Sequence, residues 1–165
     1  MKKITEQKEV FSLKLQTIYD MEKELGKFLP KISKAATDIE LSGILLKEIE
    51  ENKGQNKRIE QVFDILEENP SKNKSEIVRG FTKDIDEMLK INSSTVLKDI
   101  MIANLLFELK HIKIANYTLA TLESKKLGIL QAEEILKQNL TKEQEVEKIL
   151  EKFLEKHFEM EVIEM

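Results

Sequence analysis

FSLKLQTIYDMEKELGKFLPKISKAA, residues 11–36, carries one apolar seam with a single charged member. Successive members of the seam lie three or four residues apart and therefore share one face of a helix. They are Phe11, Leu15, Ile18, Glu22, Leu25, Leu29, Ile32 and Ala36. A carboxylate in the middle of a core-facing stripe is costly unless it is paired, protonated or bound to a metal. The rest of the chain must therefore supply a partner for Glu22.

The composition indicates a helical protein with a sizeable core. Of the 165 residues, 41% are apolar and 35% charged, with five glycines and two prolines. The net charge of −4 argues against a general nucleic-acid binder. The absence of cysteine excludes disulfides and thiolate metal sites and suits a reducing compartment. With no apolar run near the roughly 18 residues of a membrane span and no secretory signal, we expect a cytoplasmic protein without a membrane partner.

Hydrophobic periodicity and capping signals predict five helices in a single domain spanning residues 1–165. The expected helices cover residues 5–36, 38–68, 76–91, 95–126 and 130–158. Pro30 predicts a kink or an early break in the first helix, and Thr37 with Glu40 predicts a capping box at the start of the second. Two short-loop helix pairs joined by a long connection predict an all-α, antiparallel four-helix bundle with a crossover helix, the ferritin-like arrangement.

Counting residues from the turns predicts a polar layer halfway along this bundle. At about 1.5 Å per residue, Glu22 and Glu51 lie at the same distance from the turn at Thr37, and Lys110 and Glu143 reach that level from the other two long helices. Four further side chains are expected one turn away or on the flank. They are Gln55, Lys113, His111 and Glu147. The core stripe of the second helix must cross the level through Glu48, through Glu51 or Asn52, and through Gln55.

Four segments of the chain resemble the YciF-like bacterial stress proteins, a ferritin-like family. The segments are IYDMEKELGKFLPKISKAA (18–36), EENKGQNKRIEQVF (50–63), IANYTLATLE (114–123) and LGILQAEEILKQNL (127–140). The resemblance spans roughly residues 8–155. It implies a dinuclear metal site whose carboxylate ligands correspond to Glu22, Glu51, Glu143 and Glu147, with Gln55 beside them.

The fourth helix departs from the family pattern. Where the family has two glutamates flanking a His-aromatic pair, this chain has Lys110, His111, Ile112 and Lys113. An ammonium group repels a metal cation and pairs with carboxylates. We therefore expect a degenerate site without cofactor, in which a network of Lys110, Lys113, Gln55 and His111 with the carboxylates replaces the metals.

Two functional interpretations rank ahead of a third, iron storage in a cage, for which no sequence feature signals a self-assembling shell. The first is a stress-associated protein with a structural or interaction role and no catalytic residues, which fits the absence of nucleophile, Walker and Rossmann motifs. The alternative is an iron or manganese protein, an oxidase or peroxide-detoxifying enzyme, that uses the four remaining carboxylates. A homodimer is expected in either case, because an apolar strip near the C-terminus can serve as a partner surface or continue the core packing. Its members are Phe153, Leu154, Phe158, Met160, Val162 and Ile163.

Overall fold

The protein is all-helical, as the sequence predicts. The computed structural model describes residues 3–71 and 75–164, with side chains through residue 159, and this part of the chain contains five helices and no strand. The helices are α1 (Gln7–Ala35), α2 (Ile39–Ile65), α3 (Glu76–Leu89), α4 (Thr95–Lys126) and α5 (Leu130–Glu164). Within the same residues, no helix combines the length and apolar character that crossing a membrane requires.

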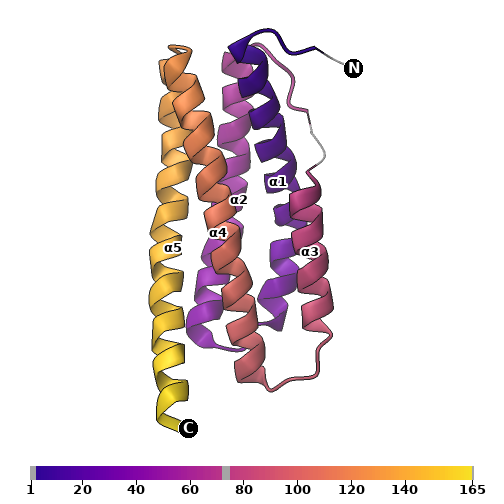
Figure 1. Cartoon of the computed structure of the whole chain (residues 1–165), viewed down its shortest axis with the longest axis vertical. Helices are drawn as coiled ribbons and strands as arrows, with labels where there is room; N and C mark the ends of the chain where they lie inside the picture. Colours follow the sequence, from indigo (N-terminus) through magenta and orange to yellow (C-terminus); the bar gives the residue numbers. More distant parts are fainter. Residues whose placement is uncertain (1–2, 72–74, 165) are drawn as a thin grey trace.

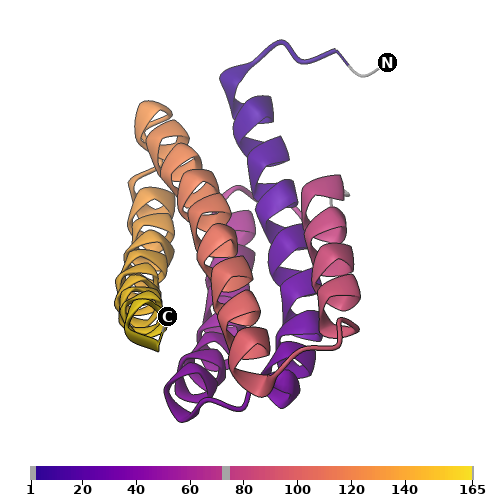
Figure 2. The same ribbon diagram turned by 60° about the horizontal axis from the view of Figure 1, so that its bottom comes forward.

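Four long helices lie side by side and the short α3 lies outside them (Figure 1). α1 packs against α2 and α4, and α5 packs against the same two helices. The view in Figure 2 shows α3 next to α1, away from α5. The chain runs down through α3 and returns to the end where α1 meets α2 before α4 begins. Every long helix therefore has its middle near the middle of the other three.

The seam of α1 forms one wall of the core. Its apolar members from Phe11 to Ile32 are buried together with Glu22, and Ala36 at the end of the helix is half-buried. Burying one such side chain contributes about 1.5–3 kcal/mol, so the seam stabilises the fold enough to hold one polar interruption. The helix continues through Pro30 to Ala35, so the early break considered for that position does not occur.

The turn between α1 and α2 differs from the expected capping box. Asp38 is the N-cap, and its side chain accepts a hydrogen bond from the Leu41 backbone N–H at 2.9 Å. Thr37 instead donates its backbone N–H (2.8 Å) and its hydroxyl (2.6 Å) to the carboxylate of Asp99 in the first turns of α4. The side chain of Asp99 thus ties the start of α4 to this turn, a contact between segments far apart in sequence.

The other helix ends differ by a few residues from the expected limits. α2 ends at Ile65, earlier than residue 68, and Glu67 just beyond it has a left-handed backbone with φ of 56°. Gly128, between α4 and α5, adopts the same region with φ of 70°, as expected of a glycine that follows a helix. α5 extends past residue 158 to Glu164.

The C-terminal strip is divided between core and surface. Phe153 and Leu154 are buried in the core, whereas Phe158 is 48% exposed. Met160, Val162 and Ile163 belong to α5, but their side chains lie outside the described residues. Two of the six residues expected at a partner surface are therefore packing residues of the bundle.

Candidate functional site

Five charged side chains meet in the interior where the four long helices face one another. The carboxylates are those of Glu22 from α1, Glu48 from α2 and Glu143 from α5, and the ammonium groups are those of Lys110 and Lys113 from α4. Each residue is at most 2% exposed. Every long helix contributes at least one member, so the network exists only when all four helices are packed.

Glu143 connects the two lysines. Its Oε2 lies 2.7 Å from Lys110 Nζ, and its Oε1 lies 2.7 Å from Lys113 Nζ. Lys110 also contacts Glu48 Oε2, and Lys113 also contacts Glu22 Oε1 at 3.2 Å. Each ammonium group is therefore shared by two carboxylates, which is the arrangement that a buried cation needs to offset its lost hydration.

Neutral groups complete the hydrogen bonding around the charges. The Gln55 amide accepts from Lys113 Nζ at 2.9 Å and donates to Glu143 Oε1. Glu22 accepts from the Tyr117 hydroxyl at 2.6 Å and from Asn52 Nδ2 at 2.7 Å. One carboxylate oxygen, Glu48 Oε1, is buried and has no hydrogen-bond partner among the described residues.

Gly26 allows the close approach of α1 and α2 at this level. A Cβ atom at this position would lie 2.8 Å from Asn52 Oδ1, well inside van der Waals contact. Asn52 also donates to the backbone carbonyl of Glu22 at 3.0 Å, one turn before Gly26. A side chain at position 26 would therefore displace the amide that holds Glu22.

Lys113 and Glu143 hold each other in their charged forms. Burial by itself would raise the pKa of Glu143, but Lys113 and Lys110 outweigh it and lower that pKa to about 2. Burial would lower the pKa of Lys113, yet Glu143 and Glu22 keep it above its usual range. At their formal charges, the three carboxylates and two ammonium groups give the buried network a net charge of −1.

Three of the residues predicted for the site lie apart from it. Glu51 is about a quarter exposed and faces Arg58 at 3.5 Å, on the outside of α2. His111 is more than half exposed and lies 3.5 Å from Glu147 Oε1 on the flank between α4 and α5. The predicted members that do come together are Glu22, Glu143, Lys110, Lys113 and Gln55.

The sequence analysis assigned Glu51 to the polar layer and left Glu51 or Asn52 open for the core stripe between Glu48 and Gln55, and the structure buries Asn52. The three-and-four spacing of Leu41, Leu45, Ile59 and Val62 continues through 48, 52 and 55, and these are the buried positions. Strict continuation of this spacing across the polar gap favours Asn52 over Glu51. No local signal in the sequence links the Tyr117 hydroxyl to a carboxylate 95 positions away.

The inward-facing residues do not fit the dinuclear metal site that the family resemblance implies. Each of the three buried carboxylates is already bound to an ammonium group. In the described part of the chain, no group of three Asp, Glu, His or Cys residues is arranged to hold a metal ion. A divalent cation would have to displace two buried lysines, which also repel it.

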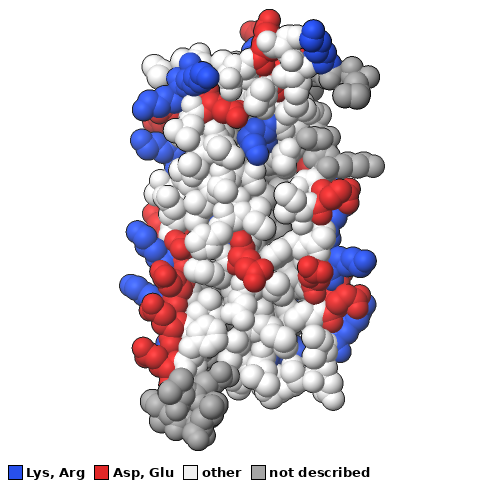
Figure 3. Space-filling view, in the orientation of Figure 1, with Lys and Arg blue, Asp and Glu red and all other residues white. Residues whose placement is uncertain are grey.

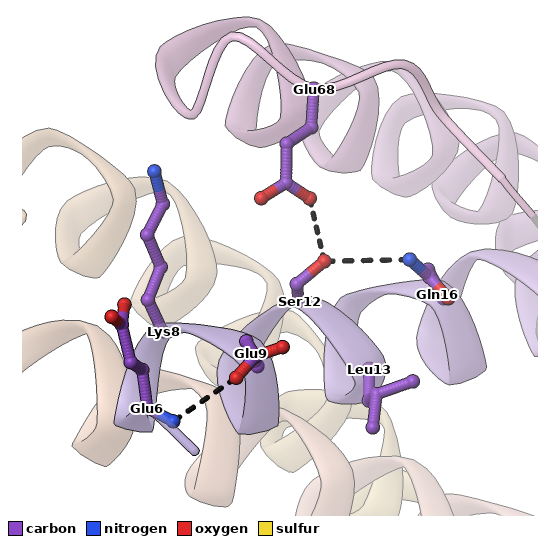
Figure 4. A pocket seen from close by; sticks show the side chains of 7 residues that line it. All are labelled: Glu6, Lys8, Glu9, Ser12, Leu13, Gln16 and Glu68. Atoms are coloured by element: carbon purple, nitrogen blue, oxygen red, sulfur yellow. Dashed lines mark hydrogen bonds between the residues drawn. The ribbon is translucent and has the colours of Figure 1, made fainter. Parts of the chain in front are cut away.

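A surface hollow near the start of α1 offers no comparable arrangement of charges. This hollow of about 310 Å³ is lined mainly by polar groups, among them Glu6, Glu9, Ser12 and Glu68. Figure 4 shows Glu68 pointing toward Ser12, whose hydroxyl donates to it at 2.6 Å. Glu9 accepts from the Glu6 backbone N–H at 3.1 Å. These groups cap α1 and connect it to the end of α2.

Comparison with known proteins places the chain among proteins of similar size. A family model described as "Domain of unknown function (DUF892)" matches residues 6–163. Protein YciF of Escherichia coli (strain K12) is 30% identical over 137 residues, which cover 82% of each chain. These matches confirm the resemblance to YciF-like proteins.

Two solved structures have the same fold. YcfI from Rhodopseudomonas palustris, whose description proposes a structural role, has a TM-score of 0.88 and 27% identity over 91% of this chain and 96% of its own. The E. coli stress protein YciF has a TM-score of 0.90 and 23% identity over 94% of this chain and 99% of its own.

The charge count predicts unequal effects of removing a lysine or a carboxylate. Lys110→Ala leaves Glu48 and Glu143 short of a partner, so we expect a loss of about 3–5 kcal/mol in the free energy of unfolding. Glu22→Gln removes the surplus negative charge, so we expect a change within about 1 kcal/mol. Urea denaturation of both variants measures this, with the exposed Lys53→Ala as the control. Equal stabilities of Lys110→Ala and the parent would contradict the charge count.

The lowered pKa of Glu143 predicts loss of stability in acid. The carboxylate has a pKa of about 2 when folded against an ordinary 4.5, so its contribution is present above pH 4.5 and is lost as the pH falls toward 2. Between pH 4.5 and pH 2, we expect the free energy of unfolding of the parent to fall by on the order of 3 kcal/mol more than that of Glu143→Gln. Denaturant melts at several pH values measure it. Glu145→Gln, an exposed site on the same helix, should follow the parent.

Proposed function

Because the chain belongs to the DUF892 family of YciF-like proteins, we propose that it is a stress-associated protein with a structural or interaction role. In this proposal the Glu–Lys network stands where the family resemblance implies a pair of metal ions. The observation that carries it is the position of Lys110 Nζ and Lys113 Nζ between the three buried carboxylates.

The charges of the two lysines support replacement of the metals. By the resemblance, positions 110 and 113 carry glutamate in the family pattern, and each exchange to lysine changes the local charge from −1 to +1. Together the two exchanges supply as much positive charge as two divalent cations. The carboxylates that remain are therefore neutralised almost completely without a metal.

The helix arrangement supports a ferritin-like interpretation of the fold. α1, α2, α4 and α5 would be the four helices of the bundle, and α3 would belong to the crossover between its two halves. Sites in such bundles are built from side chains that project inward at one level from facing helices. The network occupies that kind of position.

The metal-dependent alternative has less support. It requires Glu22, Glu51, Glu143 and Glu147 to converge, but Glu51 pairs with Arg58 and Glu147 lies beside the exposed His111. Only two of the four carboxylates belong to the buried network. We therefore favour a non-enzymatic role. The absence of cysteine suits a reducing compartment such as the cytoplasm.

The outer face of α4 supports a homodimer as the interacting form. α4 is apolar on two sides, because a second stripe with three-and-four spacing runs along its outside. The exposed leucines Leu119 (47%) and Leu122 (57%) lie on it, with Leu97 (49%) near the start of the helix. Figure 3 shows that the surface over α4 carries few charged groups, whereas charges gather at the two edges. A helix of 32 residues offers a contact about 48 Å long.

Metal loading tests the proposed replacement. We expect the parent, purified without chelator and then incubated with Fe(II) or Mn(II), to retain less than one metal per chain by elemental analysis. Lys110→Glu with Lys113→Glu should raise the affinity for Mn(II) at least tenfold, because it restores carboxylates at the two positions. The control is Lys53→Glu with Lys57→Glu, which makes the same charge change on the exposed face of α2.

Two outcomes would contradict the proposal. Two tightly held metals per parent chain would favour the oxidase interpretation. A folded double variant that binds no more metal than the surface control would show that the lysines do not occupy a former metal site.

A dimer that uses α4 should dissociate when charge is placed on its outer face. We expect the parent to sediment as a dimer and Leu119→Asp with Leu122→Asp as a monomer, since two buried carboxylates per chain would oppose association. Leu46→Asp, which changes an exposed leucine on α2, should leave the dimer intact. Dissociation by Phe158→Asp alone would instead assign the contact to the C-terminal strip.

A further inference from the structure

Tyr117 is a buried phenol bonded to a buried base. It is fully buried, and its hydroxyl donates to Glu22 Oε1 at 2.6 Å. The chain has two tyrosines and neither tryptophan nor cysteine, so few side chains can lose an electron readily. A phenol gives up an electron far more easily when a nearby group takes its proton in the same step. Glu22 is placed to be that group.

The charge of the network favours this transfer. In the resting state the three carboxylates and two ammonium groups leave one negative charge in the core. If Tyr117 loses an electron and its proton moves to Glu22, the network becomes neutral and the phenoxyl radical carries no charge. An unpaired buried charge is costly, so the oxidised state suits the interior better than the resting state does.

Asn139 provides a second, independent feature at the same hydroxyl. Burial and Glu22 raise the pKa of the Tyr117 phenol, whereas the nearby Asn139 side chain lowers it. Arg58 donates to Asn139 Oδ1, which orients the amide, and the buried Nδ2 has no hydrogen-bond partner in the described part of the chain. Once the phenol has lost its proton, its oxygen is an acceptor only. Asn139 Nδ2 can then donate to it and stabilise the radical.

We propose that Tyr117 is a one-electron donor site for oxygen-centred radicals, with Glu22 as its proton acceptor. In the step, the O–H bond of Tyr117 breaks and an O–H bond forms on Glu22 Oε1. One electron passes to the oxidant, an organic peroxyl radical or a species of the same class, which is reduced to its anion. The products are a neutral tyrosyl radical and a neutral carboxylic acid.

The surroundings of Tyr117 suit a radical that persists. The ring is shielded from water by the bundle, and about one helix diameter, roughly 10 Å, separates it from the surface that an oxidant can reach. Tyr19 lacks these features and is the matched control. It is only partly buried, and its hydroxyl lies 3.4 Å from Glu60 Oε1, which already pairs with Lys23 at 2.9 Å.

Flash oxidation with electron paramagnetic resonance detection tests the site. The oxidant is photogenerated tris(bipyridine)ruthenium(III), applied to the parent and to Tyr117→Phe, Tyr19→Phe and Glu22→Gln. We expect a long-lived tyrosyl signal in the parent and in Tyr19→Phe, and its loss in Tyr117→Phe. In Glu22→Gln the rate of radical formation should fall about 100-fold, the usual effect of removing a positioned base.

The pH dependence separates this role from a purely structural hydrogen bond. Because the proton stays on Glu22, the potential of the parent tyrosine should not change across neutral pH, whereas that of a tyrosine in water falls as the pH rises. A radical retained in Tyr117→Phe, or lost in Tyr19→Phe, would overturn the proposal. So would formation at the parent rate in Glu22→Gln. If Tyr117→Phe does not fold, Tyr19→Phe still decides the question, because Tyr117 is then the one tyrosine left in the sequence.

Discussion

The contact of two buried ammonium groups with three buried carboxylates constrains the whole bundle. Lys110 and Lys113 both bind Glu143, and each also binds a carboxylate from another helix. Buried ion pairs often add little net stability, because desolvation offsets their attraction. Their effect here is on geometry. A shift of any long helix by one turn would separate charges that cannot be buried alone, so the network sets the register in which the apolar seams pack.

The same layer makes the interior chemically unlike an ordinary helical core. Glu22 is held by an ammonium group, a phenol and an amide, and the space for that amide exists because residue 26 is glycine. Five buried polar atoms have no hydrogen-bond partner among the described residues, and two of them, Glu48 Oε1 and Asn139 Nδ2, lie in or beside this layer. Natural cores rarely leave such atoms unsatisfied without a functional reason. Glu22 and Asn139 both lie close to the Tyr117 hydroxyl, so they can accommodate a change in its protonation or oxidation state.

Interior and surface carry different parts of the proposed function. In the interior, the two lysines balance most of the carboxylate charge, and the proposed redox site uses the one negative charge that remains. The outer face of α4 has no role in that network, since the residues that enter it point to the other side of the helix. An apolar outer face on a helix that already has a full core face is typical of an association surface.

Sequence alone was sufficient for the class of fold and for the existence of a polar layer. The spacing of apolar residues specifies which face of each helix is buried, because side-chain direction repeats every 3.6 residues, and Glu22 interrupts a seam that is otherwise apolar. Tertiary packing decided which polar residues fill the layer. Residues 51–58 contain no apolar side chain that marks the buried face of α2, so the sequence left Glu51 and Asn52 both open, and the packing of α2 against α1 and α5 buried Asn52. Packing likewise decided that Asn139 of α5 is buried. It also decided that Thr37 donates to Asp99 of α4 instead of capping α2. Local sequence carries the helical period, whereas the choice among adjacent polar residues depends on which partner the other helices bring within hydrogen-bond distance.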